Sequence, residues 1–500
     1  IKRRQNMNNY FYNMVDPDEM TTLEYIPTIP KFLEFIKKQY SDYPAISDKV
    51  TTYTYEELVS RVAKRVTFIN SLGLEKGSNI AVLAKNDLDA MELFLAIPAA
   101  GHVLIMLPNA LNDKALAGIS MKFDLAGMFV GKEFTEVTAN LPCKTWSSTS
   151  IGETESTFAD VEKDTTAAIF FTGGTTGAPK GAVHSHGSIM RGSFNGVFGP
   201  GSILHKIYIA MLPLSHIFGA IMGYMAKLYA GSLTYTCTDM RAGIGDIPVV
   251  RPTTLVLVPG LVEIILNIAK LKGRAFLGDL ELIMCGAAPV PPRQMEECRE
   301  LGITLCAGYG LTECANLTSG NCDTDKKPES MGHIYPEQQV KVVDGELWIK
   351  GDNVMKEYYK DPEHTAEVLE DGWFKTGDLV EFDDNDWIYI TGRIKNLIIL
   401  PNGENVSPEE IEELFYKQQL VKDCLVQEME MNGNTVIGVE IIPYMPELDG
   451  ASEEEIQNRL QETVNEVNKE LPSFKRVLKM KVRTEDFKRS GAMKILRNQV

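Results

Sequence analysis

Six short stretches of this sequence carry residue types that bind or activate phosphate-containing molecules. The first, "TGGTTGAPKG" (172–181), follows the apolar run 169–171, a pattern typical of a buried strand that delivers a flexible polar loop. Glycine lets backbone N–H groups approach an anion, threonine hydroxyls donate hydrogen bonds, and Lys180 adds a positive charge. The loop therefore predicts phosphate binding, although a plain turn has a similar composition. Its spacing differs from G-x-x-x-x-G-K-[ST], because Pro179 precedes the lysine and Gly181 follows it.

The next stretches supply a histidine and two carboxylates. "LPLSHIFG" (212–219) contains His216, which could also be a packed core residue. "GYGLTEC" (308–314) places Thr312 and Glu313 after an aromatic residue flanked by glycines. A carboxylate beside a phosphate loop suits Mg²⁺, which typically takes one or two carboxylates plus substrate phosphates, whereas a polar helix start is the alternative. "DGWFKTGDL" (371–379) contains Asp378, an acceptor suited to ribose hydroxyls.

The last two stretches lie in the final quarter of the chain, and the second of them is rich in basic residues. They are "TGRIKNLIILPNGENVSPEEIE" (391–412) and "KRSGAMKILR" (488–497). Residues 475–500 hold nine Lys and Arg against two acidic residues, whereas the whole chain has a net charge of -18. This local reversal favours docking onto an anion, with a solvated basic face as the alternative. The overall acidity argues against a general affinity for nucleic acid or for an anionic membrane.

Alternating strand-like and helix-like segments must position these stretches. Apolar runs of buried-strand length at 79–84, 102–107, 254–259 and 280–286 alternate with helical patterns, which predicts α/β layers with mainly parallel sheets. The segment 338–350 predicts a hairpin centred on Asp344-Gly345, so a β-rich subdomain is expected before the end. Five hundred residues are too many for one core, so more than one domain is expected.

After residue 394 the pattern changes to that of a small α+β domain. Ser407 is the expected N-cap, Pro408 the first helical residue and Glu410 the capping-box glutamate. A strand at 435–443, an acidic amphipathic helix at 452–471 and a strand at 477–482 follow. The sequence thus predicts an N-terminal domain over 1–394 and a C-terminal domain over 395–500.

Composition also limits the setting of the protein. The longest apolar stretch, 91–107, is interrupted by polar residues, a proline and a glycine, so it predicts a buried helix and strand and not an integral membrane segment. The first twenty residues lack the apolar core of a signal peptide. Eight scattered cysteines show no zinc spacing, and a chain of this size needs no disulfide framework, which favours a cytoplasmic location.

In this order and spacing, the six stretches resemble the adenylate-forming family of acyl-CoA synthetases, firefly luciferase and peptide-synthetase adenylation domains. The resemblance covers residues 53–497, and Gly173, "LPLSHIFG" and "YGLTECANLTSG" look most like fatty acyl-CoA ligases. It implies an ATP-dependent ligase that forms acyl-AMP from a fatty acid and transfers the acyl group to CoA, releasing AMP and pyrophosphate. Mg²⁺ would be required, with ATP and CoA as co-substrates.

The resemblance also assigns roles to individual residues. The implied nucleotide-binding residues are Thr172, Gly173, Gly174, Thr175, Thr176, Gly177, Lys180, Gly286, Ala287, Ala288, Tyr309, Gly310, Thr312, Asp378 and Arg393. The implied catalytic residues are Lys494, which would reach the carboxylate and α-phosphate, His216 at the carboxylate site, Thr176, and Glu313 as the magnesium ligand. Lys395 matches the hinge of a rotating lid, and Gly403 matches the border of the CoA channel. The family usually has glycine where Met493 and Asn402 stand here.

Other readings of the same residues remain. The enzyme could adenylate an aromatic acid, or transfer the acyl group to a carrier protein, or the chain could be a non-catalytic sensor of ATP or acyl-AMP. The acyl pocket is expected to run from His216 past "FGAIMGYMA", where Gly219, Ala220 and Gly223 could leave space for a chain. Small residues at those positions are also ordinary choices for helix packing.

Overall fold

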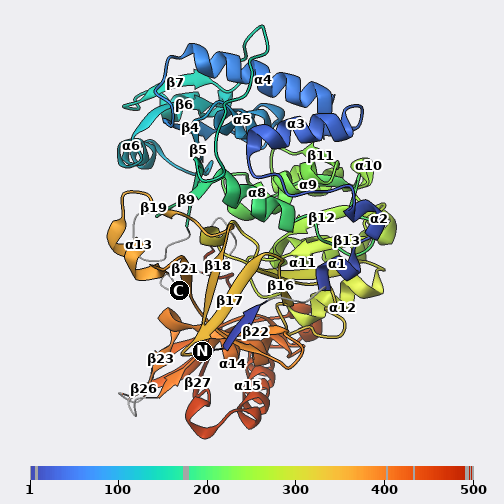
Figure 1. Ribbon diagram of the computed structural model, residues 1–500. Helices are drawn as coiled ribbons and strands as arrows, with labels where there is room; N and C mark the ends of the chain where they lie inside the picture. Colours follow the sequence, from blue (N-terminus) through green and yellow to red (C-terminus); the bar gives the residue numbers. More distant parts are fainter. Residues whose placement is uncertain are drawn as a thin grey trace.

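The computed structural model describes residues 2–5, 10–172, 180–400, 404–431, 434–489, 495 and 497. The larger part of the chain forms three sheets with covering helices, and the end of the chain forms a smaller α+β unit with a core of its own (Figure 1). This layered α/β arrangement confirms the predicted fold class. Among the described residues, no helix has both the length and the apolar character needed to cross a bilayer.

The first sheet is mainly parallel, and the phosphate-loop candidate joins two of its neighbouring strands, β8 and β9. Its order is β19-β9-β8-β5-β4-β6-β7, and β9 runs antiparallel to both of its neighbours. The strands are β4 (Asn79–Leu83), β5 (Val103–Met106), β6 (Leu125–Val130), β7 (Lys144–Ser147), β8 (Thr166–Phe171), β9 (Gly181–Ser185) and β19 (Glu357–Tyr358).

The second sheet has nine strands in the order β16-β15-β14-β13-β12-β10-β11-β2-β3. Its central strands are parallel, and every residue of β12 is buried, as expected for strands covered by helices on both faces. The strands are β2 (Pro44–Ser47), β3 (Thr52–Thr54), β10 (Ile207–Ala210), β11 (Leu233–Thr236), β12 (Thr254–Leu257), β13 (Leu282–Cys285), β14 (Thr304–Tyr309), β15 (Ser319–Asn321) and β16 (His333–Ile334).

The remaining sheets are smaller and mainly antiparallel. The third sheet has the order β1-β17-β18-β21-β20, with β22 also paired to β21. It consists of β1 (Lys2–Gln5), β17 (Gln338–Val343), β18 (Glu346–Gly351), β20 (Leu369–Glu370), β21 (Trp373–Phe382) and β22 (Ile388–Arg393). The C-terminal unit contains β23 (Ile398–Ile399), β24 (Asn405–Val406), β25 (Val421–Met431), β26 (Asn434–Pro443) and β27 (Lys479–Val482).

The described helices cover these sheets (Figure 1). They are α1 (Tyr10–Met14), α2 (Pro17–Met20), α3 (Ile29–Tyr40), α4 (Tyr55–Ser71), α5 (Leu88–Ala99), α6 (Asp113–Lys122), α7 (Thr135–Thr138), α8 (His186–Asn195), a π-helix (Phe218–Met225), α9 (Ala226–Tyr229), α10 (Met240–Val250), α11 (Pro259–Lys272), α12 (Pro292–Glu300), α13 (Pro362–Val368), α14 (Pro408–Tyr416) and α15 (Glu453–Glu470).

Local sequence patterns correctly predicted several of these elements. The hairpin is β17–β18, the apolar stretch 91–107 lies in α5 and β5, and the acidic helix is α15 with a Ser452–Glu455 capping box. The capping box predicted at Ser407 is wrong. Helix α14 does begin at Pro408, but the Ser407 hydroxyl caps no backbone N–H and donates instead to the Glu409 carboxylate at 3.1 Å.

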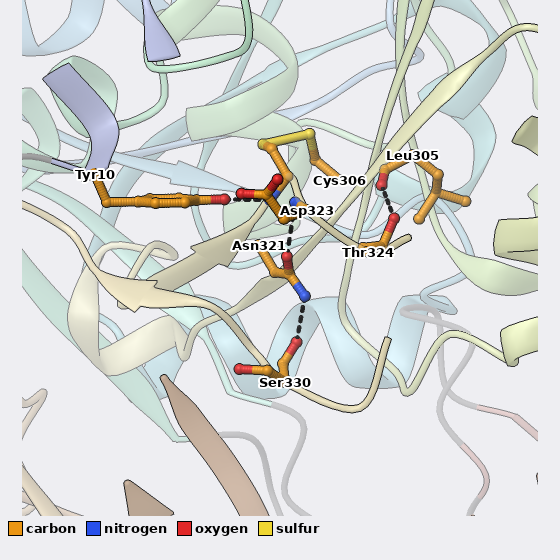
Figure 2. The surroundings of a disulfide bond; sticks show 8 residues. Tyr10, Leu305, Cys306, Asn321, Asp323, Thr324 and Ser330 are labelled. Atoms are coloured by element: carbon orange, nitrogen blue, oxygen red, sulfur yellow. Dashed lines mark hydrogen bonds between the residues drawn. A yellow bond between two sulfur atoms is a disulfide. The ribbon is translucent and has the colours of Figure 1, made fainter. Parts of the chain in front are cut away.

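A disulfide joins two neighbouring strands, contrary to the expectation that the chain needs none. Cys306 of β14 is bonded to Cys322, directly after β15, and Figure 2 shows this link beside Asn321 and Asp323. The two strands are antiparallel, with Ala307 opposite Asn321, so the cysteines occupy the next pair of positions outward. The disulfide therefore closes the base of the segment that contains Glu313.

Candidate functional site

A cavity of about 2040 Å³ lies between the large part of the chain and the C-terminal unit. Most predicted site residues that the structure describes line this cavity: Thr172, His216, Gly286, Ala287, Ala288, Tyr309, Gly310, Thr312, Glu313, Asp378, Arg393 and Lys395. They come from all three large sheets and from the start of the C-terminal unit. Residues far apart in the sequence thus meet at one concave surface, the usual form of a small-molecule site.

Seven predicted residues lie outside the described residues, and their roles stay predictions. They are Gly173, Gly174, Thr175, Thr176, Gly177, Gly403 and Lys494. The two ends of the first segment are nevertheless fixed, because the Thr172 N–H donates to the Lys180 carbonyl at 2.9 Å. Near the last segment, Arg489 forms a β-bridge with Ile495, and both residues line the cavity.

Asp378 lies at the centre of a buried polar group. Its carboxylate, whose side chain is 2% exposed, accepts a hydrogen bond from the Tyr309 hydroxyl at 2.6 Å. It also forms a two-pronged ion pair with the guanidinium of Arg393, with one of the two contacts at 3.1 Å. Strands β21 and β22 place Asp378 directly opposite Arg393, so the pairing follows from the strand register.

The charges in this group are set by burial and by their partners. Burial and the adjacent Asp378 carboxylate raise the pKa of the Tyr309 phenol well above its ordinary value. Burial alone lowers the pKa of the Arg393 guanidinium, but Asp378 outweighs it, and the net pKa is raised. Burial and the nearby Arg393 charge lower the pKa of Lys395. Near neutral pH the tyrosine is thus a neutral donor and Arg393 a fixed cation.

Glu313 lies in the segment between β14 and β15, and a tyrosine holds one of its oxygens. The Tyr358 hydroxyl donates to Glu313 Oε1 at 2.7 Å, and the Lys180 ammonium lies 5.1 Å from the centre of the Tyr358 ring. Lys180 does not itself line the cavity, whereas Tyr358 does. Tyr358 could not be predicted from the sequence, because nothing in "EYYKDP" distinguishes it from a packed aromatic residue.

A second residue that the sequence did not reveal is His184 on β9. It is fully buried, and its Nε2 donates to the Thr312 carbonyl at 2.8 Å. Burial lowers the pKa of His184 to about 4, so the ring is neutral near pH 7. Because a carbonyl can only accept, the proton must be on Nε2, which leaves Nδ1 to accept from Ser188. His184 therefore ties the segment with Thr312 and Glu313 to the first sheet.

The other end of the cavity is formed by His216 and the residues after it. Asn86 clamps the preceding loop, since its Nδ2 donates to the Leu212 carbonyl at 2.7 Å and its Oδ1 accepts from the Leu214 N–H at 3.2 Å. Phe218, the first residue of the π-helix, also lines the cavity. A side chain at Gly286 would come within 3.3 Å of the Phe218 ring, so that ring lies against bare backbone.

The structure corrects the expected path of the acyl pocket. At Gly219 the space for a side chain is filled by the Pro213 carbonyl, and at Gly223 it is filled by the Tyr208 hydroxyl, 2.8 Å from the ideal Cβ position. Both glycines and Ala220 are buried and permit close packing of the π-helix. Asn316 is a further lining residue, 7% exposed, whose Nδ2 has no hydrogen-bond partner within the described structure.

The residues present fit a magnesium ion that is completed by substrate oxygens. Within the described ranges, no group of three or more His, Cys, Asp or Glu residues could hold a metal on its own. Glu313 lines the cavity as a single carboxylate with one oxygen already held by Tyr358. Mg²⁺ commonly binds through one or two carboxylates plus substrate phosphates, so this donor set suits a metal–nucleotide complex and not a permanent metal centre.

Comparisons with known proteins agree with this geometry. Residues 33–359 match the model of the family described as AMP-binding enzyme, and residues 395–500 match the model of the AMP-binding enzyme C-terminal domain. The chain is 28% identical to feruloyl-CoA synthase from an Amycolatopsis species, over 75% of this chain and 80% of the relative. It is 27% identical to 2-succinylbenzoate–CoA ligase from Listeria monocytogenes, again over 75% and 80%.

A solved structure shares the fold. The o-succinylbenzoate CoA synthetase of Bacillus subtilis, in complex with its acyl-adenylate intermediate, superposes with a TM-score of 0.80 at 22% identity. The match covers 94% of this chain and 97% of that structure. With the family model covering well over half of the sequence, these findings show that the chain belongs to the AMP-binding enzymes, the adenylate-forming family that includes acid–CoA ligases.

Proposed function

We propose that this enzyme activates an aromatic carboxylic acid with ATP and transfers the acyl group to CoA. The observation that carries the substrate class is the aromatic lining of the cavity near His216, where the Phe218 ring packs against bare backbone at Gly286 and lines the cavity. An aromatic side chain in the lining suits an aryl substrate, because aromatic rings stack or meet edge to face at close range. The two relatives named above, a feruloyl-CoA synthase and a 2-succinylbenzoate–CoA ligase, support the same class.

The fatty acid expected from the sequence finds less support. The space at Gly219 and Gly223 is occupied by the protein's own atoms, so the π-helix offers no tunnel for an alkyl chain at these positions. Neither relative named above is described as a fatty acyl enzyme. The aromatic alternative therefore replaces the fatty acid as the proposed substrate.

In the first half-reaction, a carboxylate oxygen of the acid attacks the α-phosphorus of ATP. A bond forms between that oxygen and phosphorus, the bond to the β-phosphate oxygen breaks, and pyrophosphate leaves with the electron pair. Two anions must approach each other, so cationic and hydrogen-bond-donating groups are needed around them. Lys180, the loop 173–179 and Lys494 would supply these groups, while Asp378 and Arg393 would hold the ribose. Mg²⁺ held by Glu313 would neutralise phosphate charge.

In the second half-reaction, the thiolate of CoA attacks the carbonyl carbon of the acyl-adenylate. The carbon–sulfur bond forms and the bond between the carbonyl carbon and the phosphate oxygen of AMP breaks. AMP leaves as a phosphate anion with the electron pair of that bond. The residues named here bind and orient the reactants, so catalysis needs no covalent intermediate with the protein. Rotation of the C-terminal unit about Lys395 would withdraw Lys494 and admit the thiol past Gly403.

Pyrophosphate release across a panel of acids tests this function. The panel contains a hydroxycinnamate, benzoate, an arylacetate, hexanoate and palmitate, each with and without CoA. The aryl acids should give the highest kcat/KM, and a thioester should form only when CoA is added. A preference for palmitate would refute the aromatic assignment, and product with a phosphopantetheinylated carrier protein but not with CoA would replace the acceptor. No pyrophosphate release with any acid of the panel would favour the non-catalytic sensor.

A Lys494→Ala variant separates the two half-reactions. It should lose most acyl-adenylate formation, yet convert supplied aryl-AMP and CoA to thioester at close to the normal rate. The measurement is single-turnover kinetics of each step. Equal loss in both steps would contradict a lysine that serves only adenylation.

A further inference from the structure

Tyr358 lies where the two phosphate-facing parts of the site meet. Its hydroxyl donates to Glu313 Oε1 at 2.7 Å, and its ring lies beneath the Lys180 ammonium, 5.1 Å from ring centre to nitrogen. The residue is 6% exposed and lines the cavity. One side chain thus contacts both the expected metal ligand and the lysine of the phosphate loop.

The backbone around Tyr358 forms a strap that joins the same two parts. The Met355 N–H donates to the Glu313 carbonyl at 2.7 Å, and the Asn353 side chain donates to the Cys314 carbonyl at 3.2 Å. Further along, Tyr358 pairs with Ala182 in the antiparallel register of β19 and β9. The strap therefore runs from the segment that contains Glu313 to the strand that follows the phosphate loop.

The Tyr358 phenol is in its donating form at neutral pH. A tyrosine phenol ordinarily has a pKa of about 10, so at neutral pH it carries its proton and donates it to the carboxylate. Within the described residues, the Glu313 carboxylate accepts no side-chain hydrogen bond other than the one from Tyr358. Such an arrangement fixes one carboxylate oxygen and directs the other, as hydrogen bonds to metal ligands generally do.

We infer that Tyr358 is a positioning residue that orients Glu313 for the Mg²⁺–ATP complex and couples it to Lys180. This inference rests on the proposed function, in which Glu313 is the magnesium ligand. The phenol hydrogen bond holds the carboxylate in one rotamer, and the ring under Lys180 keeps that ammonium at a fixed distance from the carboxylate. Loss of the hydroxyl alone should therefore weaken metal binding without removing the nucleotide site.

Four variants test the inference. Tyr358→Phe removes only the hydroxyl and keeps the ring under Lys180. Tyr359→Phe is the matched control on the next residue, because its hydroxyl contacts Asp124 and Asn79 away from the site. Glu313→Gln removes the ligand charge, and the Glu313→Gln/Tyr358→Phe double variant completes the cycle. Thermal melting of each variant confirms folding before it is used.

The readout is Mn²⁺ binding in the presence of α,β-methylene-ATP, followed by electron paramagnetic resonance, which needs no turnover. Tyr358→Phe should weaken Mn²⁺ binding about tenfold, since groups that orient a metal ligand have effects of that order. Tyr359→Phe should match the wild type, and the double variant should bind no more weakly than Glu313→Gln.

Two results would overturn the inference, and they differ in whether the assignment of Glu313 as magnesium ligand is refuted as well. If Glu313→Gln weakens Mn²⁺ binding and Tyr358→Phe leaves it unchanged, the positioning role is refuted while the proposed function stands. If Glu313→Gln itself has no effect, both the magnesium assignment of Glu313 and the positioning role are refuted.

Discussion

Single residues of this site hold one another in place without a ligand. Both Asp378 oxygens are bound by Tyr309 and Arg393, and Glu313 is held by Tyr358. Groups that are already fixed need no reorganisation when charge develops, which is the usual source of strong electrostatic catalysis. The exception is Asn316, a lining residue whose amide nitrogen is itself buried and has no hydrogen-bond partner in the described structure.

Replacing Asn316 should change which acid is preferred. This buried amide donor has no partner among the described residues, so a substrate acceptor that reaches it, such as a ring hydroxyl or a keto group, would gain a hydrogen bond. Asn316→Leu should therefore lower kcat/KM about tenfold for an acid with such a substituent and much less for the unsubstituted acid. The ratio of the two kcat/KM values is the measurement, and an equal loss for both acids would show that Asn316 does not recognise the substituent.

Motifs predicted the residues of the site better than they predicted the contacts between them. Asp378 and Arg393 stand out because their types and surroundings match ribose binding, and the structure places them side by side. His184 and Tyr358 act through a carbonyl and a carboxylate that are far away in the sequence, so no local pattern marks them. Pairings of that kind follow only from the assembled sheets.

Pairs of elements are also joined by buried charge. Arg65 of α4 is fully buried, with its Nε 2.8 Å from Glu92 on α5 and another nitrogen bound to Asp89. Removing one partner from such a network leaves an uncompensated buried charge. Glu92, which interrupts the apolar run of α5, is thus explained by its two arginine partners, Arg61 and Arg65.

Arg65→Met should destabilise the packing of α4 against α5 by about 3–5 kcal/mol, because two carboxylates lose their buried partner. Urea denaturation at pH 7 measures the change. Arg61→Met is the control: Arg61 also pairs with Glu92, but its side chain is 29% exposed, so the loss should be smaller. Equal losses in the two variants would contradict the dominant role of the buried arginine.

Lys227 on α9 should make stability depend on alkaline pH. Burial, and then the charge of Lys206, lower its pKa to about 8. In the unfolded chain its pKa is about 10.4, so between these values the unfolded state binds the extra proton and stability rises with pH. Lys227→Met should remove this rise between pH 8 and 10 and should raise the unfolding free energy at pH 7 by about 2–3 kcal/mol.

Denaturant titrations at pH 7 and pH 10 check this prediction. Lys206→Met serves as the comparison, because it removes a nearby charge but leaves Lys227 buried. A pH slope that persists in Lys227→Met would assign the titration to another group.

Elements with a strong local pattern were predictable, and elements shaped by packing were not. The hairpin β17–β18 has its turn residues Asp344-Gly345 in the sequence, and both adopt positive φ. The π-helix at Phe218–Met225 has no such mark in the sequence, and the close contacts at its Gly219 and Gly223 exist only in the packed fold. Ser407 makes no side-chain cap, and its hydroxyl donates to the Glu409 carboxylate instead.

At the scale of the whole molecule, a few contacts hold the C-terminal unit in its observed orientation. The Arg293 guanidinium of α12 lies 3.9 Å from the centre of the Tyr444 ring, and Lys417 pairs with Glu329 at 2.6 Å. Cation–π contacts and exposed ion pairs are each weak, so each of these contacts stabilises the observed orientation only slightly.

Tyr444→Ala should therefore reduce the population of this orientation about threefold, the effect of losing one partly exposed cation–π contact. Fluorescence energy transfer between labels on the two parts of the chain measures the populations. The control is Arg299→Ala. Arg299 lies on the same helix as Arg293 and pairs with Glu296 on the surface, so its loss should leave the distribution of orientations unchanged. An unaltered distribution in Tyr444→Ala would show that the contact does not stabilise this arrangement.

The general division of the chain could be read from composition, but long-range strand pairing could not. The change of pattern near residue 394 agrees with a separate C-terminal core. In contrast, β1 joins the third sheet by pairing with β17, more than three hundred residues away. A four-residue strand gives no indication of a partner at that distance, because register is fixed by the assembled sheet.

The Cys306–Cys322 link encloses the chain from β14 through Glu313 to β15 in a covalent ring (Figure 2). A tethered segment loses less conformational entropy when the nucleotide binds to it. Opening the ring with dithiothreitol should therefore raise the KM for ATP and leave kcat nearly unchanged. Titrating activity against thiol concentration, with Cys322→Ser as the permanently open form, would show whether the catalyst responds to the oxidation state of its surroundings.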